Sequence, residues 1–336
     1  MAGAYDSSNM RLAALDLGSN SFHALVADVG RRRELSVVEK AKRMPRIGEA
    51  IFRTGEISGD ARKNALEALA EIVPVIERNE PDAVLAVATS AVRDARNGRA
   101  FVEEIRARFN LDVRIISGDE EGRLSYAGAR GRLGNDLGRV TLLDLGGGSL
   151  ELVVGEGDQV LQTRSAPIGV LRALTESPLS DPATPRELRA LEHWARRHVS
   201  AFLEPVRCFA SGEVVLCAGT ARALRSVARG LGRTPASGEN SERLGRDTLR
   251  FIINHLAPLS LAGRRDVPGL DPGRLDLIVH GAVILDAVLA LLGVDDARVC
   301  RAALREGLIL EHARFLRTRR SEGDVVGLKV EHRAVQ

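Results

Sequence analysis

The chain of 336 residues is poor in cysteine, in aromatic side chains and in lysine. Its three cysteines, Cys208, Cys217 and Cys300, are an odd number and include no CxxC pair. The sequence therefore provides neither a zinc-binding set nor a disulfide framework, which is typical of a reducing compartment. We expect the three thiols to be small core residues.

Long hydrophobic runs are also scarce. The opening residues, MAGAYDSSNM, lack the apolar stretch of an export signal. The longest apolar run, Leu277–Val294, includes His280 and Asp286 and predicts a buried helix better than a membrane span. We therefore predict a cytoplasmic protein that has no membrane partner.

Neither sign of charge dominates. The 45 acidic residues offset 48 basic ones and leave a net charge of +3, which disfavours nonspecific nucleic-acid binding through a uniform positive field. Only four basic residues are lysine and the other 44 are arginine, the better bidentate ligand for phosphate. A G+C-rich coding bias accounts for most of this surplus, so each arginine must be argued from its position.

The length favours two packed domains, and a sequence motif that occurs twice marks the start of each half. DLGSNS begins at Asp16 and DLGGGS begins at Asp144. Short apolar runs precede and follow each motif, which predicts a strand, a glycine-containing turn and a second strand in both halves. The four predicted strands are Leu12–Leu15, Phe22–Ala27, Val140–Leu143 and Leu150–Val154.

This strand context excludes a P-loop or a dinucleotide fingerprint, in which the glycines would open a helix. Hairpin tips of glycine and serine offer backbone N–H groups and hydroxyls that converge on an anion such as phosphate. One such hairpin alone is an ordinary β-turn. Two of them at domain spacing, each with a leading aspartate, favour a paired phosphate site.

Strands and helices alternate in the remaining sequence, as in an α/β protein. We predict domain limits of 10–131 and 132–318, a last helix that packs back on the first domain, and flexible tails at 1–9 and 319–336. Further predicted strands are Ala83–Val87, Val113–Ile116, Val160–Ser165 and Val214–Cys217. Predicted helices begin at Ser58, Thr89 and Ser117, and span Leu188–Leu203, Ala221–Arg229, Asp247–Leu256, Leu275–Leu292 and Ala303–Arg317.

The segment ISGDEEGRL crosses from a predicted strand into a predicted helix. With Ser117 as N-cap, Glu120 falls at the position that completes a capping box. Glu121 is then free, in the first helical turn at the carboxyl end of a strand, where open α/β sheets bind ligands. The alternative is that Glu121 only complements the helix dipole.

Two other strand-to-helix junctions are candidate anion sites. In ATSAVRDARN, a helix start and Arg93 one turn later suit phosphate, although a solvated surface arginine is an equal alternative. In CAGTARAL, Gly219 and Thr220 suit a nucleotide or a phosphate only weakly. His23, His280 and His312 lie in apolar contexts and are expected to be satisfied core histidines.

Taken in order, DLGSNS, ATSAVRDARN, SGDEEGRL, DLGGGSLEL, GRLDLIVHGAVIL and LREGLIL resemble the Ppx/GppA family of exopolyphosphatases and guanosine pentaphosphate phosphohydrolases. The resemblance covers about residues 11 to 315. It implies the α/β fold of actin-like ATPases (the ASKHA group, ribonuclease H-like), with duplicated domains around a cleft. The chain resembles the short, two-domain members, and Ala218 stands where many relatives have the first glycine of a Gly-Gly-Thr turn.

The resemblance also implies roles for individual residues. Glu121 matches the catalytic glutamate, and Glu151 a second acidic residue that assists catalysis. Asp144, with Glu151, is the candidate ligand set for Mg²⁺. The residues implied to bind phosphate are Asp16, Gly18, Ser19, Asn20, Ser21, Arg93, Gly146, Gly147, Gly148 and Ser149.

The expected reaction is in-line attack of water on a terminal phosphorus of inorganic polyphosphate, with Glu121 as base. Guanosine pentaphosphate is the alternative substrate, which would connect the protein to the stringent response. A noncatalytic sensor of guanosine tetraphosphate and a sugar- or acetate-type kinase of the same superfamily also stay open. The family makes a homodimer plausible.

Overall fold

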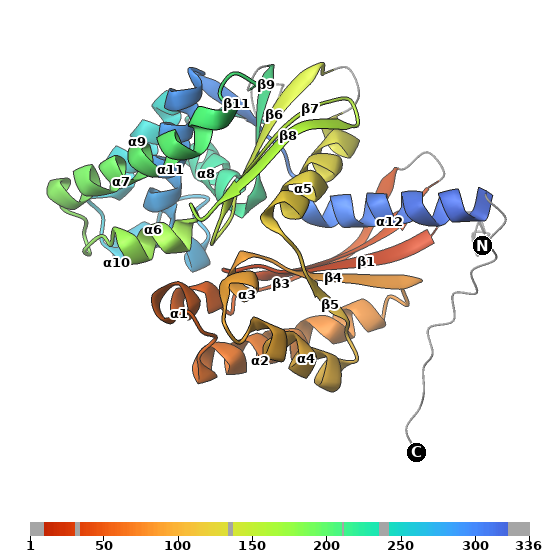
Figure 1. Cartoon of the computed structure of the whole chain (residues 1–336). Helices are drawn as coiled ribbons and strands as arrows, with labels where there is room; N and C mark the ends of the chain where they lie inside the picture. Colours follow the sequence, from red (N-terminus) through yellow and green to blue (C-terminus); the bar gives the residue numbers. More distant parts are fainter. Residues whose placement is uncertain (1–9, 31–33, 134–136, 210–211, 235–241, 322–336) are drawn as a thin grey trace.

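Two β-sheets, each with helices packed against it, make up the protein (Figure 1). The structure, a computed structural model, describes residues 10–30, 34–133, 137–209, 212–234 and 242–321. The predicted flexible tails lie outside these ranges, except that the last helix continues to Ser321. No helix among the described residues combines the length and the apolar character that a membrane span needs.

The first sheet has the strand order β3-β2-β1-β4-β5. β1 (Met10–Leu17), β2 (Phe22–Val29) and β3 (Leu35–Arg43) form an antiparallel meander, and β4 (Ala83–Ala88) and β5 (Val113–Ile115) run parallel to β1. β1 is apolar on both sides because helices cover both faces of the sheet. On one face lie α1 (Ile47–Thr54), α2 (Gly59–Glu77), α3 (Ser90–Asp94) and α4 (Gly98–Phe109).

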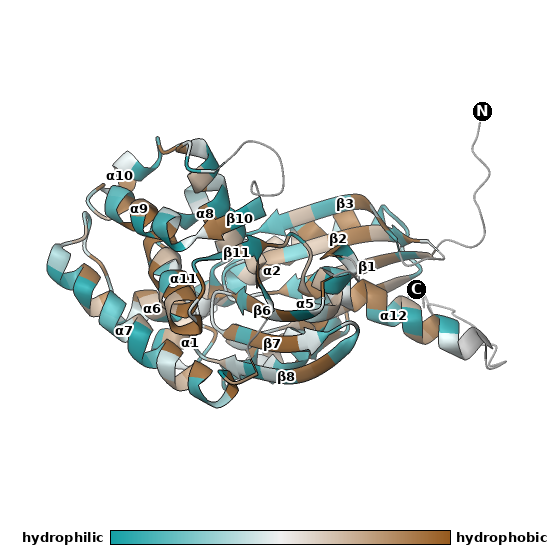
Figure 2. Cartoon of the chain, turned by 90° about the horizontal axis from the view of Figure 1, so that it is seen from above, coloured by the Kyte–Doolittle hydropathy of each residue, from teal (hydrophilic) through white to brown (hydrophobic). Residues whose placement is uncertain are grey.

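The second sheet repeats the opening of the first. β6 (Arg139–Leu145), β7 (Leu150–Glu156) and β8 (Gln159–Ala166) form another antiparallel meander, and β9 (Glu213–Cys217) pairs in parallel with β6. β11 (Asp296–Val299) and β10 (Arg243–Gly245) extend the sheet beyond β9. Both meanders contain long hydrophobic stretches (Figure 2).

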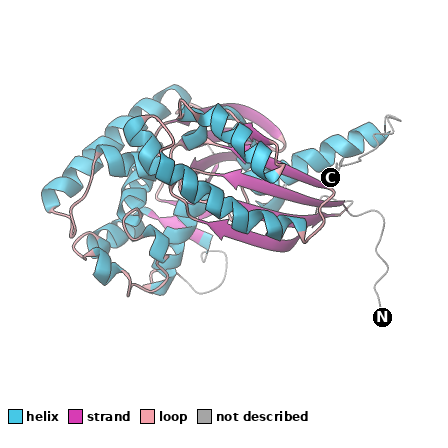
Figure 3. Cartoon of the chain, turned by 90° about the horizontal axis from the view of Figure 1, so that it is seen from below, coloured by secondary structure: helices cyan, strands magenta, loops and turns pink. Residues whose placement is uncertain are grey.

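Most of the helices of the second half cover one face of this sheet and share its main core. In the view from below, the helices in front of the strands are instead those that cover the outer face of the first sheet, such as α2 and α4 (Figure 3). The helices are α6 (Val170–Glu176), α7 (Pro185–Leu203), α8 (Ala218–Gly230), α9 (Arg246–Leu256), α10 (Leu261–Arg264) and α11 (Ile278–Leu292). His280, within α11, is fully buried and lies within hydrogen-bond distance of the Ser177 and Asp276 carbonyls, as expected for a satisfied core histidine.

Two helices lie between the sheets. α5 (Gly118–Leu133) packs on the second sheet through Tyr126 and Ala129, and α12 (Leu304–Ser321) packs on β1 and β2. A Cβ atom added to Gly128 would lie 2.0 Å from the Ala303 carbonyl oxygen, and one added to Gly307 would lie 1.9 Å from that of Leu124. The two helices therefore cross with their backbones in contact. We keep the domain limits 10–131 and 132–318 as a proposal.

The structure corrects two expectations. Cys217 and Cys300 are buried, but Cys208 is exposed after the end of α7 and is no core residue. The helix expected to open at Thr89 and Ser90 is broken into α3 and α4, because the backbone at Ala95 is extended.

Candidate active site

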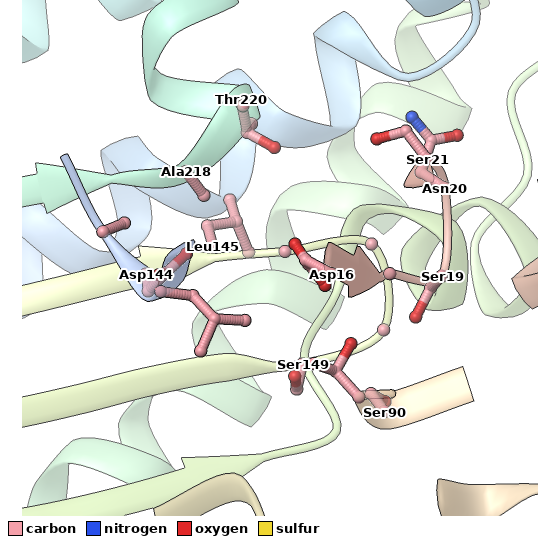
Figure 4. Close-up of a pocket in the computed structure, with 18 of the residues that line it drawn as sticks. Asp16, Ser19, Asn20, Ser21, Ser90, Asp144, Leu145, Ser149, Ala218 and Thr220 are labelled. Atoms are coloured by element: carbon pink, nitrogen blue, oxygen red, sulfur yellow. The ribbon is translucent and has the colours of Figure 1, made fainter. Parts of the chain in front are cut away.

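The turns that follow β1 and β6 line one cavity between the two sheets (Figure 4). Its volume is about 110 Å³. From the first turn it is lined by Asp16, Gly18, Ser19, Asn20 and Ser21, and from the second by Asp144, Gly146, Gly147, Gly148 and Ser149. The duplicated sequence motif is thus assembled into a single site.

The two turns approach each other closely. A Cβ atom added to Gly147 would lie 3.0 Å from the Ser19 Cβ and 3.2 Å from the Asn20 amide nitrogen. One added to Gly148 would lie 2.8 Å from the Ser19 hydroxyl and 2.5 Å from the Ser90 hydroxyl. The glycines of the second turn are therefore needed because the first turn and the start of α3 lie against them.

Several buried polar atoms at the turns lack a partner among the described residues. They are Oδ1 of Asp16 and both the amide nitrogen and the amide oxygen of Asn20. Buried polar groups in folded proteins are nearly always hydrogen-bonded, and leaving one unsatisfied costs about 1–3 kcal/mol. These atoms indicate that the site is built for a polar ligand.

Glu121 lies at the start of α5 and lines the same cavity. The Ser117 hydroxyl accepts a hydrogen bond from the Glu120 amide (3.1 Å), as a capping residue should. The predicted capping box is incomplete, however, because the Glu120 carboxylate pairs with Arg114 instead of the Ser117 amide. Glu120 points away from the site, and Glu121, with 13% of its side chain exposed, points into it.

Arg93 and Glu151 lie behind the cavity rather than on its wall. Arg93 Nη1 donates to Glu121 Oε2 at 3.2 Å and to the Ile116 carbonyl oxygen at 2.9 Å. Glu151, on β7, is 1% exposed and accepts a hydrogen bond from the Ser165 hydroxyl at 2.8 Å. Arg93 therefore orients Glu121 in this structure, and Glu151 is coupled electrostatically to Glu121 and Asp144.

Four carboxyl groups from both halves are close enough to perturb one another. Burial raises the pKa of Asp16 to about 7, and burial with repulsion from Asp144 raises the pKa of Glu151 to about 8. Burial also raises the pKa of Asp144, although a hydrogen bond from the Ser125 hydroxyl (2.6 Å) opposes this shift. Burial and the Glu151 charge raise the pKa of Glu121 well above its usual value, against the effect of Arg93.

This concentration of acid suits a divalent cation. Among the described residues no group of three or more His, Cys, Asp or Glu side chains is arranged to hold a metal by itself. Mg²⁺ commonly binds to one or two carboxylates and completes its shell with water and substrate phosphates. Asp16 and Asp144, which both line the cavity, fit that pattern, and the buried Oδ1 of Asp16 has no other partner among the described residues.

Three arginines that we did not single out from the sequence line the same cavity: Arg222, Arg274 and Arg305. Arg274 is 8% exposed. Neither Arg274 nor Arg305 forms a side-chain hydrogen bond or an ion pair with the described residues. Each lies within a motif noted above, CAGTARAL, GRLDLIVHGAVIL or LREGLIL, but only the fold brings the three together. Their guanidinium groups suit an anion, in a cavity whose carboxyl groups suit a cation.

His23 also lines the cavity and is therefore no simple core histidine. Its Nε2 lies 2.8 Å from the Ser21 hydroxyl. Burial, with repulsion from Arg305 and Arg222, lowers the His23 pKa to about 2. A neutral imidazole is thus available to fix the Ser21 hydroxyl.

The start of α8 closes the cavity beside these arginines. Ala218, Gly219 and Thr220 all line it. Ala218 has a φ of 67°, in the left-handed region, and a Cβ atom added to Gly219 would lie 2.3 Å from the nearest Arg274 nitrogen. The weakly predicted Gly219 and Thr220 are thus close to the predicted phosphate turns.

The sequence model of the Ppx/GppA phosphatase family matches residues 25–315. The chain belongs to this family. Among curated Ppx/GppA proteins, exopolyphosphatase 1 of Mycobacterium tuberculosis is 31% identical over 304 residues, which cover 90% of this chain and 88% of the relative. The guanosine-5'-triphosphate,3'-diphosphate pyrophosphatase of Vibrio parahaemolyticus is 28% identical over 91% of this chain and 60% of its own length.

The fold is that of the Ppx/GppA family and of actin-like ATPases. A solved exopolyphosphatase from Cytophaga hutchinsonii superposes with a TM-score of 0.81 at 22% identity, over 90% of this chain and 98% of that one. At this identity the likeness concerns the fold alone. The predicted α/β architecture with duplicated actin-like domains and a cleft between them is confirmed.

Proposed function

We propose that the chain is a phosphoanhydride hydrolase that releases terminal phosphate from inorganic polyphosphate. One observation carries this proposal: the two glycine- and serine-containing turns meet at one cavity, with the Glu121 carboxylate and three arginines on its wall. The names of the mycobacterial relatives support the choice of polyphosphate. The cavity provides cationic groups for the substrate and a base for the attacking water.

Each group has a role in this mechanism. The turn hydroxyls and amides bind the terminal phosphoryl group, and Glu121, held by Arg93, orients water for in-line attack and accepts its proton. The raised pKa of Glu121 makes it a stronger base than an ordinary carboxylate. Asp144 and Asp16 would hold Mg²⁺, with the Glu151 carboxyl group behind them, and the ion would neutralise charge on the phosphates.

Guanosine pentaphosphate is the second candidate substrate, because a relative with that activity in its name aligns over nearly the whole chain. In that case the protein would act in the stringent response. For either substrate we propose a cytoplasmic enzyme, and a homodimer as its assembly. A sensor without turnover would bind these ligands and release no phosphate.

The test measures phosphate release from polyphosphate, guanosine pentaphosphate and ATP, with and without Mg²⁺. Positioned general bases contribute about 10²- to 10⁴-fold to rate, so we expect Glu121→Gln to lower kcat by that factor and to keep substrate affinity. Glu120→Gln is the matched control, because the neighbouring carboxylate pairs with Arg114 outside the cavity. An active Glu121→Gln enzyme would contradict the assignment, and binding without turnover by the wild type would indicate a sensor.

A further inference from the structure

A second cavity shares Arg222 with the candidate active site. Its volume is about 640 Å³, compared with about 110 Å³ for the first. No acidic or aromatic side chain among the described residues lines it. Five basic residues do: Lys40, Arg222, Arg225, Arg229 and Arg301.

Three of these arginines follow one face of α8. Arg222, Arg225 and Arg229 are spaced three and four residues apart, which places their side chains on the same side of a helix. Like charges at this spacing destabilise an isolated helix by about 0.2–0.5 kcal/mol per pair. Repulsion among these three arginines is therefore unfavourable for the helix unless an anion neutralises their charge.

Arg225 is a further sign that the second cavity suits an anion. It is 9% exposed, and its guanidinium makes no hydrogen bond or ion pair with any described residue. The acidic residue that interacts electrostatically with Arg225 is Glu242, but the Glu242 carboxylate also pairs with Arg298, whose Nε lies 4.0 Å from Oε2. Burial and repulsion from Arg301 lower the Arg225 pKa. The Arg225 guanidinium therefore faces the second cavity without a partner in the described part of the chain and is available to pair with an anion there.

Arg222 connects the two cavities. Its Nη1 donates to the Arg301 carbonyl oxygen at 3.2 Å, which fixes the guanidinium beside the second cavity while it also lines the first. A linear polyanion whose end lies between the two turns of the first cavity can therefore extend past Arg222 into the second cavity. Basic side chains line both parts of this path.

Given the proposed function, we infer that the second cavity binds the distal phosphates of a polyphosphate chain whose terminal phosphate occupies the first cavity. The lining matches a ligand that repeats the same negative charge. A guanine base would find no carboxylate acceptor for its ring N–H groups and no aromatic side chain to stack on among the described lining residues. The second cavity thus favours polyphosphate over guanosine pentaphosphate.

The experiment compares Arg225→Gln/Arg229→Gln with the wild type on long-chain polyphosphate and on triphosphate. We expect the KM for the long chain to rise at least tenfold with little change in kcat, and the KM for triphosphate to stay within twofold. Arg186→Gln/Arg189→Gln, which removes two exposed arginines from α7, is the control for lost charge and should leave both KM values unchanged.

Binding is measured separately in a Glu121→Gln background, where titration with long-chain polyphosphate should show the same loss of affinity. If the double variant misfolds, the exposed Arg229→Gln alone provides the comparison, with a smaller rise in KM. An unchanged long-chain KM, an equal loss for both chain lengths, or a loss confined to guanosine pentaphosphate would overturn the inference. A wild type that hydrolyses no phosphoanhydride would instead refute the proposed function.

Discussion

Ala218 has a backbone conformation that suits glycine better than alanine. Its φ of 67° lies at the junction of β9 and α8, beside the candidate active site. A left-handed conformation brings Cβ close to the following carbonyl oxygen and costs a residue with a side chain about 1–2 kcal/mol. The position at which this chain has alanine and many relatives have glycine is thus a strained one.

Ala218→Gly should therefore stabilise the protein by about 1 kcal/mol, since relief of strain exceeds the greater entropy of glycine in the unfolded chain. Urea denaturation would measure the change. The matched control is Ala223→Gly in the same helix, which should destabilise by about 1 kcal/mol because glycine is a poor helix former. Equal signs for the two substitutions would contradict the explanation.

Local sequence predicted part of the site and missed another part for a physical reason. The two turns and Glu121 were predicted because short motifs fix hairpins and helix starts. Arg222, Arg274 and Arg305 come from three separate segments that only tertiary packing brings together. The prediction of His23 as a core histidine was wrong, because the apolar sequence around it does not reveal that this side of the strand lines a cavity.

At the scale of elements, the crossing of α5 and α12 joins the two halves. The helix contact depends on Gly128 and Gly307, where neither backbone leaves room for a methyl group. α5 also positions Glu121 in its first turn. The packing of α12 therefore supports the element that bears the proposed base.

Gly307→Ala should destabilise the protein by about 1–3 kcal/mol through overpacking, although alanine is the better helix former. Gly131→Ala is the control, because a Cβ atom there would meet only the flexible end of Leu310. That variant should be neutral or stabilised by up to about 1 kcal/mol. Denaturant unfolding of both variants gives the comparison, and a Gly307→Ala protein as stable as the wild type would refute the argument.

Elements with a clear period were predicted from the sequence, whereas several of the short ones were not. The helix capped by Ser58 and the long helices of the second half are present, because apolar periodicity over several turns is a strong signal. α1, α6, β10 and β11 were missed. Each has only three to eight residues, and contacts with the rest of the fold decide its conformation.

At the scale of the whole molecule, carboxyl groups from both halves converge, and this convergence makes stability depend on pH. Asp16 and Glu151 bind protons more tightly in the folded protein, with pKa values of about 7 and 8, than in the unfolded chain, where ordinary values are 3.8 and 4.5. At pH values between the unfolded and the folded pKa values, the folded state binds more protons than the unfolded chain. Stability must then fall as pH rises.

We predict that the unfolding free energy in EDTA decreases between pH 5 and pH 8, and that Glu151→Gln reduces the decrease. Urea denaturation at several pH values measures both slopes. Glu156→Gln, an exposed position on the same strand, is the control and should follow the wild type. If wild type and Glu151→Gln lose stability equally over this range, the buried carboxyl does not carry the effect.

The return of the last helix to the first strands also affects how the protein is made. The apolar side chains of β1 and β2 that contact α12, among them Leu12 and Leu25, are synthesised long before Leu308 and Ile309. One face of the first sheet thus stays uncovered until the chain between them has left the ribosome. Because exposed apolar surface promotes aggregation, the nascent chain depends on fast completion or on chaperones.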